Sequence, residues 1–205
     1  MPDENPYWYN ANHVLVPYCS SDSWSGAKAQ ADTRDGWRFM GSLIIRQVIA
    51  DLIPLGLGRT SGAELLLVGS SAGALGVMIN LDRINSFLHN EKNLKVLVRG
   101  VSDSGWFLDR EPYTPGAVAA SEGVRQGWKL WEGSLPEACV KQHKSEPWRC
   151  YYGYRLYPTL KCKFVIAPRH THFYILNYTF SQYYFSQYLI KCENFSTTVR
   201  ISMAV

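Results

Sequence analysis

The segment Gly69–Gly73 reads Gly-Ser-Ser-Ala-Gly, and its residue types and spacing are the best suited to chemistry in this chain. It matches the pattern G-x-S-x-G, in which the middle serine sits on a tight turn that raises its hydroxyl above a sheet. The middle serine is Ser71, so the pattern predicts Ser71, and not Ser70, as a nucleophile. The backbone N–H of the next residue, Ala72, would face a developing oxyanion, and the N-terminus of a following helix would add partial positive charge there.

Two other interpretations of this turn stay open. Small residues also occur where a strand and a helix pack closely without any chemistry, and glycine-rich turns also bind phosphate. The phosphate interpretation is disfavoured because no lysine follows the glycines, as a Walker motif needs, and the G-x-G-x-x-G spacing is missing. The flanking sequence favours a nucleophile. Residues 64–68 form a continuous apolar run typical of a buried parallel strand, and residues 72–89 are predicted to form a helix.

The elements around the turn alternate between strands and helices. Further strands are expected at 13–18, 94–101 and 163–167, and further helices at 38–55 and 121–131. This alternation predicts an α/β fold with a parallel sheet flanked by helices. Residues 168–205 show no clear period and many bulky aromatic side chains, so no element is predicted there. We therefore expect one domain at 1–167 and a separate tail at 168–205.

Length, charge and hydropathy exclude several classes of protein. The 205 residues suit one domain with a substantial core. The net charge is +4 and no run of five basic residues occurs, which argues against a dedicated nucleic-acid surface. No stretch reaches the roughly eighteen apolar residues of a membrane span, and the N-terminal residues lack the features of a signal peptide. Aromatic residues make up 14% of the chain, which fits either apolar binding pockets or an aromatic core.

The cysteines show no C-x-x-C spacing, so a zinc site and a thioredoxin-like motif are disfavoured. Disulfides with one cysteine left over, or buried thiols, both remain open. Two N-x-S/T sequons, at Asn177 and Asn194, favour a secreted protein. No metal ion or organic cofactor is implied. The cysteines are Cys19, Cys139, Cys150, Cys162 and Cys192.

Longer blocks surround these motifs within residues 5–162. They read NPYWYNANHVLVPYCSSDSWSGA, FMGSLIIRQVI, LLLVGSSAGALGVMINLDR, VRGVSDSGWFLD and EPWRCYYGYRLYPTLKC. In this order the blocks resemble the Notum group of carboxylesterases, in the pectin acetylesterase-like family. The resemblance implies an α/β-hydrolase fold and a secreted enzyme without a cofactor. The implied substrate is a lipidated Wnt protein, from which the enzyme removes palmitoleate and so dampens Wnt signalling.

The same resemblance implies roles for particular residues. Ser71 matches the nucleophile of the family, and Ala72 matches one oxyanion-hole donor. A long acyl chain suits apolar walls with polar groups only at the ester. Ordinary core packing is the alternative for each aromatic residue among these walls. The residues that match the lipid pocket are Phe107, Tyr151, Tyr152, Leu75 and Val124.

The chain departs from the family pattern in three places. It starts after the Gly-Gly-Trp-Tyr-Cys segment that completes the oxyanion hole of the family. The family acid follows the strand at 163–167, where this chain reads PRHTHFY without Asp or Glu. The family histidine lies further on, in a region that this chain lacks. His170 and His172 with Asp103 are not expected to rebuild the triad, although a serine needs a positioned base to be a good nucleophile.

These departures lead to the expectation of a truncated member with an incomplete sheet. Strands lost from the sheet would leave unpaired edges. Cys19 would lose an upstream partner, and one pair among Cys139, Cys150 and Cys162 is expected to form a disulfide. Two alternatives to a Notum-type esterase stay open. One is a carbohydrate O-acetylesterase, and the other is a lipid-binding or poorly folded fragment without catalysis.

Overall fold

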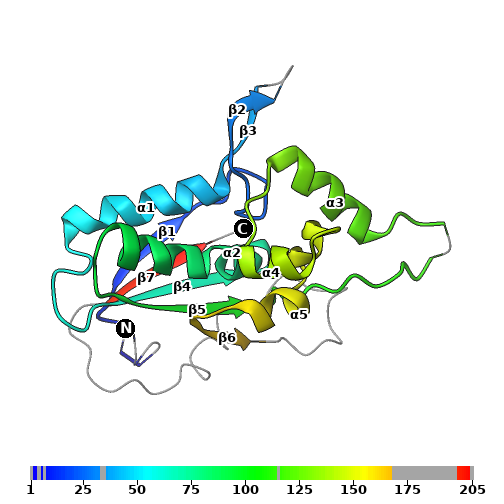
Figure 1. The fold of residues 1–205 in the computed structure, drawn as a ribbon. Coiled ribbons are helices and arrows are strands. Elements are labelled where there is room, and N and C mark those ends of the chain that lie inside the picture. Colours follow the sequence, from blue (N-terminus) through cyan, green and yellow to red (C-terminus); the bar gives the residue numbers. More distant parts are fainter. Residues whose placement is uncertain are drawn as a thin grey trace.

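Five parallel strands form the central sheet, in the order β1-β7-β4-β5-β6 (Figure 1). They come from a computed structural model, which describes residues 2–3, 6, 8–32, 36–114, 116–167 and 198–203. The α/β class predicted from the sequence is therefore confirmed. The strands are β1 (Asn12–Val16), β4 (Glu64–Ser70), β5 (Leu97–Asp103), β6 (Lys163–Ala167) and β7 (Thr198–Met203).

Strand β4 shows why an unbroken apolar run forms a central strand. Its side chains alternate between the two faces of the sheet. Leu65 and Leu67 join a core with two helices on one face, whereas Leu66 and Val68 join a smaller core on the other face. Both faces are covered, so apolar residues occupy consecutive positions from Leu65 to Val68, as is usual in a parallel sheet.

Helices α1 (Gly41–Leu55) and α2 (Ala72–Ser86) cover one face of the sheet (Figure 1). Helix α1 buries Ile45 and Ile49, which are four residues apart and therefore lie on one helical face. Helix α2 continues into η1 (Phe87–Glu91), a π-helical turn, so the predicted helix at 72–89 changes its winding over the last residues.

A hairpin that was not predicted precedes α1. Its strands are β2 (Lys28–Asp32) and β3 (Trp37–Phe39), which pair antiparallel and project from the body of the molecule (Figure 1). The predicted start of this helix at residue 38 is wrong, because Trp37–Phe39 pairs with β2 and the helix begins only at Gly41. The strand KAQAD has no β-branched or aromatic residue, so its sequence carries little strand signal.

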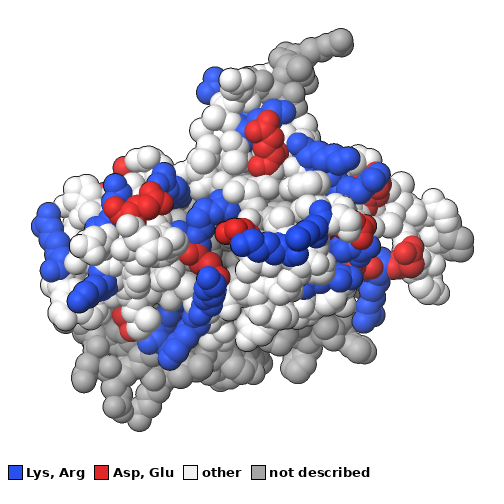
Figure 2. Space-filling view, viewed as in Figure 1, with Lys and Arg blue, Asp and Glu red and all other residues white. Residues whose placement is uncertain are grey.

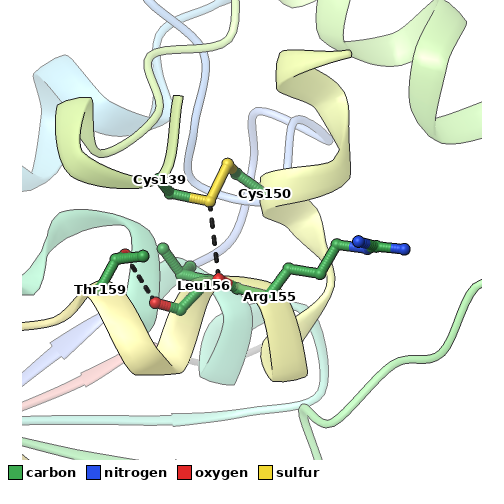
Figure 3. The surroundings of a disulfide bond; sticks show 5 residues. All are labelled: Cys139, Cys150, Arg155, Leu156 and Thr159. Carbon is green, nitrogen blue, oxygen red and sulfur yellow. Dashed lines mark hydrogen bonds between the residues drawn. A yellow bond between two sulfur atoms is a disulfide. The ribbon is translucent and has the colours of Figure 1, made fainter. Parts of the chain in front are cut away.

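Between β5 and β6 the chain forms a set of short helices at the carboxyl end of the sheet (Figure 1). A disulfide joins Cys139 and Cys150, whose Cα atoms lie 6.0 Å apart (Figure 3). This settles the pairing that the sequence left open, and Cys162 keeps a half-buried free thiol whose pKa burial raises to about 12. The helices are α3 (Ala120–Trp131), α4 (Glu137–Gln142), η2 (Pro147–Tyr151), α5 (Gly153–Leu156) and η3 (Tyr157–Thr159).

Strand β7 comes from the part of the chain for which the sequence analysis predicted no element. It lies between β1 and β4 and is parallel to both, with Met203 beside Val16 and Gly69. Strand β7 thus fills the gap between β1 and β4, whereas β1 and β6 stand at the two ends of the described sheet and each pairs there with one strand, as the expectation of unpaired edges implies. The rest of the tail, including His170 and His172, lies outside the described residues, as do Asn177, Cys192 and Asn194.

Charged side chains are spread over the face seen in Figure 2, with acidic groups among the basic ones. Several pair with each other, for example Arg46 with Glu91 and Lys141 with Glu137. Exposed pairs of this kind contribute little to stability. In the part of the chain that the structure describes, no helix is long and apolar enough to cross a membrane.

Candidate active site

Ser71 occupies the turn between β4 and α2, as the G-x-S-x-G pattern predicts. Its backbone angles are φ 53° and ψ −120°, which are rare for a residue with a side chain. Such strain persists only where the surroundings hold it, and it is concentrated at functional sites. The Ser71 side chain is exposed at the carboxyl end of the sheet. The strand, turn and helix predicted around Ser71 are thus confirmed, while its catalytic role stays a prediction.

Close approaches of the backbone fix this turn. A Cβ atom on Gly69 would overlap the carbonyl oxygen of Gly73, so strand and helix can meet only if residue 69 is glycine. The Ser71 N–H donates to the carbonyl oxygen of Asp103, at 3.0 Å, which ties the turn to the end of β5. Gly105 then packs directly against Ala74 in the first turn of α2. Small residues therefore let the strand and the helix pack closely at this turn.

The N-terminus of α2 is placed to stabilise negative charge. Ala72 is the first residue of the helix, and the first N–H groups of a helix have no acceptor within it. The Ser71 carbonyl accepts the N–H groups of Ala74 and Leu75, at 3.1 and 3.2 Å, and so closes the first turn. This arrangement suits an oxyanion donor at Ala72, which remains a prediction.

Asp103 lies at the end of β5 with its carboxylate beside two serines. Ser104 Oγ donates to Oδ1 at 2.9 Å, and Ser70 Oγ approaches Oδ2 at 3.5 Å. The Ser70 side chain thus faces Asp103, which agrees with the choice of Ser71 as the nucleophile. Asp103 is buried, and within the described residues its side-chain hydrogen bonds go to these two serines.

No histidine hydrogen-bonds to Ser71 within the described residues. His13 bonds to the carbonyl oxygen of Trp8 and His89 to that of Val96, at 2.9 and 2.7 Å. No three His, Cys, Asp or Glu side chains of the described part gather as metal ligands either. The base that a serine nucleophile needs is therefore not found in this part of the chain.

The residues predicted to bind the acyl chain divide into two groups. Leu75, Val124 and Tyr151 belong to one apolar cluster beside the first turns of α2. Tyr152 is also buried, and its ring packs edge-on against another aromatic ring. Phe107 lies outside these clusters, on the loop after β5, and is 39% exposed. The structure thus brings three of the five residues together and places the other two on adjoining segments.

A buried polar loop, residues 20–26, was missed by the sequence analysis. The Asp22 carboxylate is fully buried at its centre and accepts hydrogen bonds from the loop and from Gly41 at the start of α1. Ser25 of this loop shares a 2.5 Å hydrogen bond with the Tyr151 hydroxyl. The loop therefore supports a residue of the predicted acyl site. The serines and the glycine of this loop are typical of a surface turn. Its burial becomes clear only from the structure, in which several N–H and O–H groups donate to Asp22.

Replacing Tyr151 or Tyr152 by phenylalanine is expected to change the free energy of unfolding differently. Tyr151→Phe removes a paired hydroxyl and leaves Ser25 with one hydrogen bond fewer, so it is expected to lower the free energy of unfolding by about 1 kcal/mol. The Tyr152 hydroxyl is buried and has no hydrogen-bond partner among the described residues. Tyr152→Phe is therefore expected to leave stability unchanged or raise it by up to about 1 kcal/mol. Urea denaturation of both variants checks the prediction, and a larger loss for Tyr152→Phe than for Tyr151→Phe would contradict it.

Comparison with known proteins agrees with this geometry. The family model described as Pectinacetylesterase matches residues 1–198. The chain belongs to the pectinacetylesterase family. A crystal structure of the Wnt deacylase Notum from Drosophila superposes with a TM-score of 0.78 and 71% sequence identity. It covers 81% of this chain and 48% of that chain.

Within the pectinacetylesterase family, the chain is similar to Notum proteins. It is 74% identical over 163 residues to the Drosophila melanogaster palmitoleoyl-protein carboxylesterase NOTUM, and 46% identical over 169 residues to the Homo sapiens protein of that name. These alignments cover 78% and 79% of this chain, but 24% and 34% of the relatives. The chain thus spans about a quarter to a third of the length of these curated relatives.

Proposed function

We propose that this chain is part of a serine carboxylesterase of the Notum type, with Ser71 as its nucleophile. The observation that carries the proposal is the exposed Ser71 on a strained strand-to-helix turn at the N-terminus of α2. A relative with 74% identity is named a palmitoleoyl-protein carboxylesterase, and a similar structure is named a Wnt deacylase. These names support a palmitoleoylated Wnt protein as the substrate.

The proposed chemistry follows from the turn. Ser71 Oγ attacks the ester carbonyl carbon and transfers its proton to a base, and an acyl-serine forms as the alcohol leaves. The Ala72 N–H donates to the oxyanion of the tetrahedral intermediate, where the N-terminus of α2 adds partial positive charge. Water then hydrolyses the acyl-serine. The base and its orienting acid are not among the hydrogen-bond partners of Ser71 in the described part of the chain.

The apolar residues near the turn would hold the acyl chain. Leu75 lies one helical turn after Ser71, and its cluster contains Val124 and Tyr151. Tyr152 and Phe107 would extend this wall from the adjoining segments. Such a site suits a long hydrocarbon chain, since it offers apolar side chains and keeps polar groups at the ester. A secreted location is part of the proposal and is supported by the disulfide, which persists in oxidising compartments.

Acyl binding without turnover is the second candidate. It is favoured by one observation, which is that no described histidine hydrogen-bonds to Ser71. The two candidates share the apolar residues and differ only in proton transfer. A carbohydrate O-acetylesterase would differ in the acyl group, because an acetyl group has no need of a long apolar wall.

Hydrolysis of chromogenic octanoate and acetate esters tests the proposal. The purified chain is compared with Ser71→Ala and with the matched control Ser70→Ala, whose hydroxyl faces Asp103. Octanoate hydrolysis that is lost only in Ser71→Ala would support the esterase. A preference for acetate would favour the O-acetylesterase. No turnover by a folded sample that binds a fluorescent fatty acid would favour acyl binding without catalysis.

A further inference from the structure

An ion-pair cluster joins the loop after β5 to residues 149–155, the segment that contains Cys150 of the disulfide. Its centre is Asp109, whose side chain is 14% exposed. Asp109 accepts a hydrogen bond from the Tyr154 hydroxyl at 2.6 Å and one from Arg149 at 3.0 Å. Arg155 Nη2 lies 3.6 Å from Oδ2 of Asp109. Three side chains from one short stretch thus converge on a single carboxylate of another segment.

The cluster holds its cations in fixed orientations. Arg149 also donates to Glu146 through two nitrogen atoms and stacks over the ring of Trp148 at 4.7 Å. Arg155 stacks over the ring of Tyr154, and its backbone carbonyl faces Cys139 of the disulfide, while its side chain extends away from the sulfur atoms (Figure 3). Planar guanidinium groups held in this way are pre-organised for a carboxylate.

Asp109 is charged under ordinary conditions. Burial alone would raise the pKa of its carboxyl, but the hydrogen bond from Tyr154 and the charges of Arg155 and Arg149 outweigh burial and lower the pKa. A partly buried carboxylate with several donors is costly to disrupt, because each donor would lose its partner. The cluster therefore acts as a fixed connection and not as a surface ion pair.

A second contact holds the same loop three residues earlier. Trp106 packs against Gly153, where a Cβ atom would lie 2.5 Å from the indole ring, and it meets Tyr157 edge-on at 6.1 Å. Phe107 lies between Trp106 and Asp109. Since both flanking regions are attached to residues 149–157, the loop has little freedom at Phe107. Its side chain is 39% exposed and remains available for contact.

We propose that Asp109 is a positioning residue for acyl-chain length, because it fixes Phe107 relative to the segment that carries Tyr151 and Tyr152. The inference rests on the proposed function, since it concerns the wall of the same acyl site. Asp109 itself does not contact the acyl chain in this proposal. Without its carboxylate, the loop after Trp106 is released and the wall loses its fixed spacing.

The expected effect is a change in selectivity for chain length. A long acyl chain makes more contacts with the walls than a short one, so a displaced wall costs it more. For Asp109→Asn, we expect the affinity for a fluorescent sixteen-carbon fatty acid to fall by about ten-fold or more, and that for an eight-carbon analogue to fall by less than about three-fold. Asp109→Glu is expected to restore part of the selectivity.

The experiment measures both affinities in the full chain at a temperature where circular dichroism shows each variant folded. Glu91→Gln is the matched control, because it removes an ion pair with Arg46 that joins two elements away from this loop. If Asp109→Asn does not fold, Tyr154→Phe removes one hydrogen bond of the cluster and is expected to shift selectivity in the same direction.

Each outcome has one meaning. Loss of long-chain affinity in Asp109→Asn, with Glu91→Gln unchanged, supports the proposal. Unchanged selectivity, or an equal loss of affinity for both chain lengths, overturns this inference but not the proposed function. If the unsubstituted chain binds neither fatty acid, the proposed function itself fails, and the inference fails with it.

Discussion

Asp22→Ala is expected to lower the free energy of unfolding by roughly 4 kcal/mol, since each buried donor left without a partner costs about 1–3 kcal/mol. The carboxylate accepts hydrogen bonds from Ser20 Oγ and Trp24 N, at 2.6 and 3.0 Å. It also accepts from Gly26 N and Gly41 N, at 3.1 and 2.7 Å. Asp22 is fully buried, so water cannot readily replace it.

The conformation of the loop adds to this cost. Ser21, Ser23 and Trp24 all have positive φ, at 50°, 52° and 59°, a region that side chains disfavour. The Trp24 carbonyl accepts a hydrogen bond from Asn80 of α2 at 2.8 Å, and the Trp24 side chain packs against Gly76. The carboxylate therefore stabilises a strained loop that docks on the helix of the candidate nucleophile.

Urea denaturation, followed by circular dichroism, measures this effect if the slope with denaturant stays constant. Asp51→Ala is the matched control, because the Asp51 carboxylate is exposed and accepts one hydrogen bond from Gln47. It is expected to change stability by less than about 0.5 kcal/mol. A loss below about 1 kcal/mol for Asp22→Ala would mean that the loop holds its shape without the carboxylate.

The parts of the fold that the sequence predicted have strong local signals. The run ELLLV before the glycines identified β4, and the spacing of Ile45 and Ile49 identified α1. Ser71 was found because its motif is local, with the strand, turn and helix all within one short stretch. The apolar residues of the acyl site came from the resemblance to a family, and not from their own pattern.

The features that were missed depend on contacts between distant segments. Asp22 lies among serines, as in an ordinary surface loop, and its burial depends on Gly41 and on packing against α2. At the cluster, Asp109 bonds to Arg149 and Tyr154, which follow it by 40 and 45 positions in the chain. No periodic pattern in the sequence indicates contacts over such separations. Strand β7 enters the sheet between two strands that precede it by more than a hundred residues, so its pairing is set by topology.

Gly69→Ala is expected to destabilise the protein by about 3 kcal/mol, near the upper end for overpacked sites. The added Cβ would overlap the carbonyl oxygen of Gly73 and lie 2.7 Å from the N–H nitrogen of Ala74. These are backbone atoms at the start of α2, so no side chain can move aside. Strand and helix would have to separate, which would also displace Ser71.

Gly123→Ala provides the opposite control for Gly69→Ala. Gly123 lies in α3 with open space around its Cα, and alanine is the better helix former, so this substitution is expected to raise stability by about 0.5–1 kcal/mol. Thermal denaturation of both variants measures the difference in sign. If Gly69→Ala were as stable as the unsubstituted chain, the close approach at the turn would not be needed for folding. A destabilised Gly69→Ala variant would show that folding needs this close approach beside Ser71.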